Sequence, residues 1–238
     1  MFEAFGLSDR GCIRTNNEDY FISDSRCGIF IVADGMGGAN GGEFASRLSA
    51  ETLYQYLLTP GQDGVTGSLE RGFSRANEAV LKASGEHPAL EGMGTTLVAA
   101  QVVDGTQVQL ASVGDSRAYQ LTQDGFSILT TDHTWVAEVG NRLGLSDEAL
   151  KRHPMRHVLT MAIGVSDEVQ INSHVINVSS GDQLLLCSDG LHGVVQENIL
   201  RDTLKSEKSL PGKAHYLIEA AKKQGGPDNI TVVLVRVL

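Results

Sequence analysis

The sequence predicts a single α+β domain in which antiparallel sheets are covered by helices. Short apolar runs recur along the chain between turn residues, and three further stretches carry apolar residues at helical spacing. The 238 residues contain no linker, repeat or low-complexity segment. We therefore expect one domain that spans residues 1–238.

The strand predictions rest on apolar, β-branched runs that end at turn residues. Asp104-Gly105 and Gln123-Asp124-Gly125 each separate two such runs, as in a β-hairpin. The run Leu184–Cys187 lacks polar alternation, as expected of a strand that is covered on both faces. The predicted strands span 28–33, 95–103, 108–113, 116–121, 126–129, 169–178, 183–188 and 230–238, and 20–22 is strand-like.

Three helices are predicted from apolar residues that recur at intervals of three and four. They cover 45–56, 69–83 and 214–221. The third has Pro211 near its start and Gly225-Gly226 after its end, which are typical helix boundaries. We interpret these apolar stripes as core-facing and assign them no chemistry.

Composition restricts the possible functions. The formal net charge is −10 and no dense cluster of Lys and Arg occurs, which argues against a nucleic-acid partner. No apolar run reaches the length of a membrane span and no signal peptide is visible, so we expect a cytoplasmic protein without a membrane partner. The three cysteines form no Cys-x-x-Cys pair, which disfavours a zinc ribbon and a disulfide framework.

Aspartates recur where an apolar run or a strand boundary meets a glycine. The four are Asp34, Asp115, Asp189 and Asp228. One Asp-Gly pair is most often only a turn. That interpretation weakens for four aspartates that all lie at the edges of core strands. Glu18 and Asp19 add two carboxylates just before the strand-like residues 20–22.

If these acids converge, their charges require a cation, because clustered carboxylates cannot all ionise without one. Oxygen ligands without a His or Cys spacing favour Mg²⁺ or Mn²⁺ over zinc. Two such ions about 4 Å apart can share a water, lower its pKa and position it for in-line attack on phosphorus. No cysteine is followed by an arginine six positions later, so no covalent phosphoenzyme is expected.

The glycine-rich run 35–42 raises the alternative of a nucleotide-binding loop. It matches neither G-x-G-x-x-G, because Asn40 fills the last position, nor G-x-x-x-x-G-K-[ST]. Tight packing around the turn that carries Asp34 is the better interpretation.

A series of short motifs runs from about residue 6 to the C-terminus. They are Ser8-Asp9-Arg10-Gly11, Arg14, Asn17-Glu18-Asp19, Val32-Ala33-Asp34-Gly35-Met36-Gly37-Gly38, Gly41-Gly42-Glu43-x-Ala45-Ser46, Gly94-Thr95-Thr96, Val113-Gly114-Asp115-Ser116-Arg117, Ser188-Asp189-Gly190-Leu191 and Gly226-Pro227-Asp228-Asn229-Ile230-Thr231. In this order they resemble the metal-dependent protein phosphatases (PPM, type 2C) in their compact bacterial form. One of these motifs alone would be weak evidence for the resemblance, whereas the full set in this order is highly specific to the family.

The resemblance implies a four-layer αββα sandwich, with two central antiparallel β-sheets flanked by helices and a metal site at one end. It also implies a flap at about 136–157 beside the active cleft, with a short helix that starts at 146–148. We expect the flap to contribute to the choice of substrate.

The resemblance implies that Asp34 bridges two Mn²⁺ or Mg²⁺ ions and that the carbonyl of Gly35 adds a ligand. Asp189 and Asp228 would complete the shell of one ion. Asp34 is accordingly expected to be a catalytic residue as well as a metal ligand.

Four further residues receive roles from the resemblance. Glu18 would act mainly through metal-bound water, with Asp19 close behind it. Asp115 would bind a possible third, weaker ion. Arg14 would be the catalytic arginine that binds the substrate phosphate, because a guanidinium can hold phosphate oxygens bidentately.

Three positions depart from the family pattern: Met36, Gly193 and Met161, which stands where relatives often carry an arginine. Met36 stands where some members carry a histidine proposed as the general acid, so the proton for the leaving group must come from metal-bound water or another residue. Gly193 stands where many members carry an aspartate that helps to hold the third ion. His192 could replace that aspartate, but we interpret it as a surface histidine.

The implied function is that of a protein serine/threonine phosphatase. It would hydrolyse phosphoserine and phosphothreonine by direct attack of a water that bridges two Mn²⁺ or Mg²⁺ ions, and would counteract serine/threonine kinases in bacterial signalling. The expected partners are phosphorylated proteins, either kinase substrates or a kinase itself, and the expected state is a monomer.

Two alternatives stay open. One is a catalytically silent member of the family that binds phosphorylated partners, although retention of the aspartates and Arg14 argues against it. The other is an enzyme for a different phosphoester, such as a small metabolite, because the chemistry would be the same.

Overall fold

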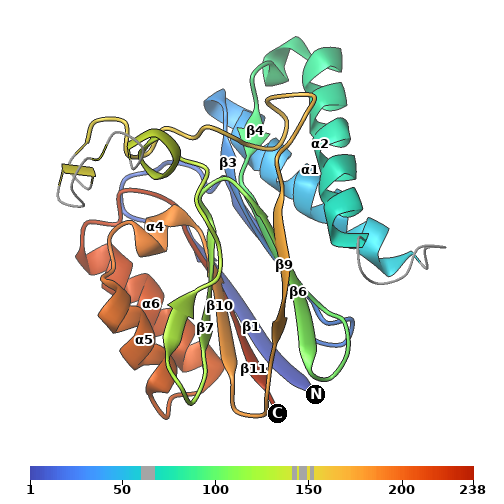
Figure 1. Cartoon of the computed structure of the whole chain (residues 1–238). Helices are drawn as coiled ribbons and strands as arrows, with labels where there is room; N and C mark the ends of the chain where they lie inside the picture. Colours follow the sequence, from blue (N-terminus) through green and yellow to red (C-terminus); the bar gives the residue numbers. More distant parts are fainter. Residues whose placement is uncertain (60–67, 141–143, 145–148, 151–152) are drawn as a thin grey trace.

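The computed structural model describes residues 1–59, 68–140, 144, 149–150 and 153–238, with only the backbone at 38–40. Two antiparallel sheets face each other, and a pair of helices covers the outer face of each (Figure 1). The chain therefore forms the predicted four layers. Both termini lie at one end of the sandwich, and the loops around α4 and β4 lie at the other end (Figure 1).

The first sheet joins the two ends of the chain. Its order is β1 (Phe2–Asp9), β11 (Ile230–Val237), β10 (Gln183–Cys187), β7 (Arg117–Leu121) and β8 (Phe126–Ile128). The strand β1 was not predicted, because its side chains are mostly only half-buried and its apolar residues form no continuous run. It pairs with β11 along its whole length, from Phe2 opposite Val237 to Asp9 opposite Ile230.

The second sheet carries most of the acidic motifs of the N-terminal half. Its order is β2 (Asp19–Asp24), β3 (Ile29–Met36), β5 (Leu97–Val102), β6 (Gln107–Val113) and β9 (Asn172–Asn177), and β4 (Gly94–Thr95) pairs with the end of β3. The strand predicted at 95–103 is interrupted at Thr96, which hydrogen-bonds with the backbone of Asp34. The strand predicted at 169–178 is shorter, since Val169 and Ile171 pack into the core before it begins.

All three predicted helices are present and longer than predicted. The helices are α1 (Gly38–Leu58), α2 (Ser68–Glu86), the 3₁₀-helix η1 (Pro88–Leu90), α4 (Asp189–His192), α5 (Glu197–Lys205) and α6 (Leu210–Lys223). The start of α6 is capped by Ser209, whose hydroxyl accepts from the N–H of Gly212 at 3.3 Å. The helix α5 was not predicted, because it buries only one short stripe. Among the described residues, no helix is both long and apolar enough to cross a membrane.

Three buried apolar clusters hold the layers together. Phe73 belongs to the cluster between the second sheet and helices α1 and α2, and Leu217 to the cluster between the first sheet and helices α4, α5 and α6. Phe30 belongs to the third cluster, between the two sheets. Full burial of one such side chain contributes roughly 1.5–3 kcal/mol. The hydrophobic interior thus fixes the sandwich and leaves its ends for polar residues.

The predicted flap at 136–157 leaves the sandwich after β8. It begins with the π-helix η2 (Val136–Gly140). Trp135 stacks on His153 with 4.5 Å between ring centroids, and the Trp135 N–H donates to the carbonyl of Val158 at 2.9 Å. The predicted helix start at 146–148 lies outside the described residues.

Candidate active site

A cleft of about 900 Å³ opens at the end of the sandwich that lies away from the termini. It brings together side chains and backbone from seven separate segments of the chain. The predicted site residues that line it are Arg14, Glu18, Asp34, Gly35, Asp115, Asp189 and Asp228. Asp19 is the one predicted site residue that lies behind the cleft wall.

Asp34 is held at the end of β3 by backbone pairing on both sides. Its carbonyl accepts from the N–H of Thr96 at 2.8 Å and from the hydroxyl of Thr95 at 2.9 Å. Its own N–H donates to the hydroxyl of Thr96 at 3.0 Å. On the other side Asp34 lies opposite Asp19 of β2, and the next N–H, that of Gly35, donates to the carbonyl of Glu18 at 3.1 Å. Strand register therefore fixes four of the predicted site residues against one another.

Glycine is required at two positions beside Asp34. A Cβ at Gly35 would collide with the carbonyl of Gly42 and lie 2.6 Å from the carbonyl of Glu18. A Cβ at Gly42 would lie 2.7 Å from Glu18 Oε2. The glycine-rich run is thus tightly packed, as predicted, but most of it forms the first turn of α1 rather than a loop.

Asp19 is buried beneath the cleft, with 7% of its surface exposed. Its Oδ2 accepts from the hydroxyl of Ser188 at 2.7 Å, while its Oδ1 has no hydrogen-bond partner within the described part of the chain. Burial is the main cause that raises the pKa of Asp19 to about 7, and the charges of Asp189 and Asp228 act in the same direction. A buried carboxylate oxygen without a donor is suited to a cation.

The carboxyl groups of the cleft perturb one another. Burial, followed by the charge of Asp19, raises the pKa of Asp34 well above its usual range. Burial and then Asp189 raise the pKa of Asp115 to about 7, and burial and then Asp228 raise that of Asp189. Clustered carboxylates must therefore share protons or bind cations at neutral pH.

The donor set fits Mg²⁺ or Mn²⁺, which prefer oxygen ligands. In the part of the chain that the structure describes, no three His, Cys, Asp or Glu side chains are placed so that they enclose one ion by themselves. Mg²⁺ does not need such a cage, because it usually retains several waters and is held by one or two carboxylates together with substrate phosphate. The buried, mutually repelling carboxylates and the unpartnered Asp19 Oδ1 are consistent with that mode of binding.

Arg14 projects into the cleft from the loop between β1 and β2. Its Nη2 donates to Asp228 Oδ2 at 2.7 Å, and about half of its side chain, 49%, is exposed. The guanidinium is therefore held beside the carboxylates while it can still reach a ligand.

The loop that carries Arg14 is anchored by Asn229, which is 4% exposed. The Asn229 Oδ1 accepts from the N–H of Glu18 at 2.8 Å, and its Nδ2 donates to the carbonyls of Arg10 at 2.9 Å and Asn16 at 2.8 Å. The side-chain amide of Asn229 thus bonds to three backbone groups of the loop 10–18. Asn229 was not among the predicted site residues, and its place directly after Asp228 was the available signal.

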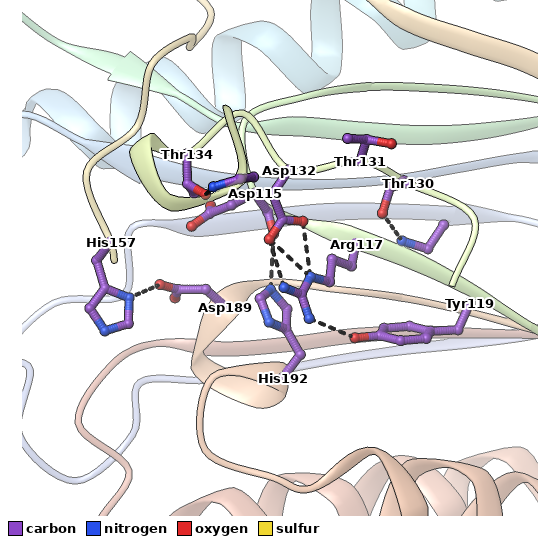
Figure 2. Close-up of polar contacts among 12 residues, drawn as sticks. Asp115, Arg117, Tyr119, Thr130, Thr131, Asp132, Thr134, His157, Asp189 and His192 are labelled. Carbon is purple, nitrogen blue, oxygen red and sulfur yellow. Dashed lines mark hydrogen bonds and ion pairs between the residues drawn. The ribbon is translucent and has the colours of Figure 1, made fainter. Parts of the chain in front are cut away.

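Residues at the end of the flap and just after it also line the cleft. Arg156, His157 and Leu159 line it, and His157 Nδ1 lies 4.0 Å from Asp189 Oδ2 (Figure 2). His157 was predicted at the end of the flap, but its approach to an aspartate of the site was not predicted. Only tertiary structure brings this contact together, since 32 positions separate the two residues in the sequence.

The interpretation of His192 as a surface histidine is wrong. Its ring is half-buried, and Nε2 lies 2.9 Å from the backbone carbonyl of Asp115 (Figure 2). Burial lowers the pKa of His192, so the neutral ring donates to that carbonyl. The short helix α4 turns this residue inward, which its place after Asp189-Gly190-Leu191 did not reveal.

Two of the three departures from the family pattern, Met36 and Gly193, line the cleft. A Cβ at Gly193 would lie 2.7 Å from the backbone carbonyl of Asp189. The local backbone therefore disfavours an aspartate at position 193.

Comparisons with known proteins agree with this geometry. The family model for protein phosphatase 2C matches residues 14–234. The serine/threonine phosphatase stp of Listeria innocua is 39% identical over 237 residues, which cover 96% of this chain and 93% of that protein.

Solved structures give the same result. The crystal structure of the Mycobacterium tuberculosis serine/threonine phosphatase PstP/Ppp superposes with a TM-score of 0.91 at 33% identity, covering 99% of this chain and 98% of that one. The crystal structure of the catalytic domain of PstP in complex with two manganese ions superposes with a TM-score of 0.88 at 34% identity, covering 100% of this chain and 98% of that one. Sequence, fold and the acidic cleft thus lead to one assignment: this chain belongs to the protein phosphatase 2C family of metal-dependent serine/threonine phosphatases.

Proposed function

We propose that this chain hydrolyses phosphoserine and phosphothreonine in proteins with the help of two Mn²⁺ or Mg²⁺ ions in the acidic cleft. One observation carries the proposal: three buried or half-buried aspartates, Asp34, Asp189 and Asp228, share one cleft with a half-exposed arginine. A silent binding module would not need this carboxylate set, and a general phosphate-binding site would not place so many acids beside its arginine.

The residues that would hold the ions follow from their place in the cleft. Asp34, the Gly35 carbonyl, Asp189 and Asp228 would be direct ligands, and Glu18 would act through water with Asp19 behind it. Asp115 would hold a weaker third ion. When bound, two such ions supply positive charge at the phosphate and lower the pKa of a water.

Arg14 would bind the substrate phosphate. Its Nη2 pairs with Asp228 at 2.7 Å, so the guanidinium is already directed toward the acidic cluster. A phosphate can be held bidentately by a guanidinium, which fixes the direction in which the ester bond faces the site.

Met36 has no proton to donate, so it cannot assist the leaving serine or threonine oxygen. Its thioether side chain contributes only to the shape of the cleft wall, beside Gly94. The proton therefore has to come from water or from another group in the cleft.

The expected partners of the enzyme are phosphorylated proteins, as for the relatives named above. A kinase or its substrates as the particular partner, a cytoplasmic location, a monomeric state and a substrate-selecting flap remain predictions from the sequence.

The test is hydrolysis of para-nitrophenyl phosphate with Mn²⁺ or Mg²⁺, then with excess chelator, beside Asp34→Asn. We expect metal-dependent turnover that Asp34→Asn reduces by more than the roughly 100-fold seen for partners outside the ligand shell. Asp124→Asn, the same substitution on an exposed turn, serves as the matched control.

Two outcomes would favour the alternatives. A folded protein that shows no turnover with either metal would indicate a silent phosphoprotein-binding module. Turnover of sugar phosphates in preference to a phosphopeptide panel would indicate a small-metabolite phosphatase.

A further inference from the structure

Arg117 and Asp132 form a tightly hydrogen-bonded ion pair next to the cleft (Figure 2). Arg117 Nη2 donates to Asp132 Oδ2 at 2.6 Å, and its Nε donates to Oδ1 at 2.9 Å and to Oδ2 at 3.2 Å. The arginine Nη1 also lies 3.3 Å from the hydroxyl of Tyr119. Two parallel bonds of this kind fix orientation as well as distance.

The pair is largely shielded from water. The exposed fractions of the two side chains are 29% for Arg117 and 14% for Asp132. Such a pair is screened less by salt than an exposed one, so its geometry persists.

The two partners belong to different walls of the cleft. Arg117 begins β7, two positions after Asp115, whereas Asp132 lies at the base of the flap, three positions before Trp135. Neither side chain lines the cleft, so the pair can act only through the residues that it holds.

A second set of bonds joins the same two segments. The N–H of His133 donates to the carbonyl of Gly114 at 2.9 Å, and the N–H of Gly114 donates to His133 Nδ1 at 3.2 Å. The carbonyl of His133 in turn accepts from the N–H of Thr160 at 3.0 Å. Thr134 forms an isolated antiparallel β-bridge with Leu159, and Leu159 lines the cleft.

The charges around Asp115 also connect the ion pair with the predicted metal site. Asp115 lies beside Asp132, and the guanidinium of Arg117 is bonded to Asp132 (Figure 2). Removal of the arginine would leave Asp132 as an uncompensated negative charge beside Asp115. Removal of the aspartate would release the guanidinium from its fixed place.

We propose that Arg117 and Asp132 are a positioning pair that links the Asp115 side of the cleft to the flap wall, so that cation affinity and the placement of the flap wall change together. The proposal rests on the proposed metal-dependent function. The core aspartates are held elsewhere, Asp34 by Thr96 and Asp228 by the loop that carries Arg14. The pair should therefore affect the binding of the weaker third ion, which was assigned to Asp115.

The test compares Asp132→Asn, Arg117→Gln and the double variant with the wild type. Binding of Mn²⁺ is measured by calorimetry, and emission of Trp135, which is the single tryptophan, is followed during a Mg²⁺ titration. Asp202→Asn, which removes the exposed Arg201–Asp202 pair, is the matched control.

We expect each single variant to weaken the weakest Mn²⁺-binding step by about 10- to 100-fold, as is typical of groups behind a metal ligand. Each should also shift Trp135 emission, whereas the control should do neither. The double variant should be no worse than either single variant, since the two residues act as a unit. If Asp132→Asn fails to fold, Arg117→Lys replaces it, because it keeps the charge and loses the bidentate geometry.

Additive losses in the double variant would overturn the proposal. Metal affinity and Trp135 emission at wild-type values in folded single variants would also overturn it. Failure of metal-dependent catalysis itself would look different, because wild-type protein would then show neither turnover nor Mn²⁺ binding. The effect of the pair would in that case still be read from Trp135 emission.

Discussion

The two walls of the cleft are anchored in different ways. The wall that carries Arg14 is held through its main chain, because the buried amide of Asn229 bonds to three backbone groups of the loop 10–18. The flap wall is held at its base by an ion pair and by His133, and its residues Met155 and Val158 remain 37% and 43% exposed.

The difference has a functional meaning. Backbone anchoring does not depend on most of the side chains in the loop, so it can keep Arg14 in one place. The flap wall is anchored by side chains only at its base. The rest of this wall can therefore change in sequence while the carboxylates stay in place. One part of the cleft lining is therefore fixed through backbone bonds, while the flap part is fixed mainly at its base.

Among changes outside the predicted metal ligands, the largest effect is expected from Asn229→Asp, which breaks the main-chain anchor. The carboxylate can still accept from Glu18, but it cannot donate to the carbonyls of Arg10 and Asn16, each of which would then cost about 1–3 kcal/mol if left unpaired. We expect kcat/KM to fall by about 10- to 100-fold, with a raised KM as Arg14 shifts. Steady-state kinetics with a phosphopeptide and a thermal melt measure both effects.

Asn198→Asp, the same change on the exposed face of α5, is the control. Kinetics within the wild-type range for a folded Asn229→Asp variant would show that the loop does not depend on this amide, and the contrast between the walls would be lost.

An intermediate effect is expected from pH in the metal-free protein, because both walls meet at the same buried carboxylates. In the folded state the pKa of Asp19 and that of Asp115 are each about 7, above the unfolded value of about 3.9. The folded state therefore binds more protons between these values, and the stability that this contributes is lost as the pH rises through 7. We expect the melting temperature of chelator-treated protein to fall from pH 6 to pH 8.

Excess Mg²⁺ should reduce that dependence, because a bound cation replaces the protons. The variant Asp19→Asn should flatten the pH profile in the absence of metal. A chelator-treated wild type whose melting temperature does not change across this window would contradict the burial of ionisable charge in the cleft.

The smallest effect is expected from His153→Leu, which removes the ring stacked on Trp135 in the flap. An aromatic stack contributes about 0.5–1.5 kcal/mol beyond its buried area. We expect a shift in Trp135 emission and an almost unchanged kcat/KM for para-nitrophenyl phosphate. A loss of activity as large as that of Asn229→Asp would show that the flap wall is tied to the chemistry as firmly as the loop wall.

Much of the secondary structure could be predicted from the sequence, because apolar periodicity reports burial directly. The unbroken run Leu184–Cys187 became β10, fully buried. The prediction failed where burial is partial: β1 has half-buried side chains along most of its length, and α5 buries only Leu200, Thr203 and Leu204. It also failed at the glycine-rich run, where close packing against β3 stabilises a helix that propensity disfavours.

The sequence by itself determined the αββα architecture and which acids could form a site, because Asp34, Asp189 and Asp228 stand at strand ends within ordered motifs. Tertiary structure alone decided what surrounds them. Asn229 anchors a loop that begins 219 positions away, at Arg10, and His192 turns inward to Asp115. The physical reason is that local pattern reports which face of a segment is buried, whereas hydrogen bonds between distant segments depend on how the layers pack.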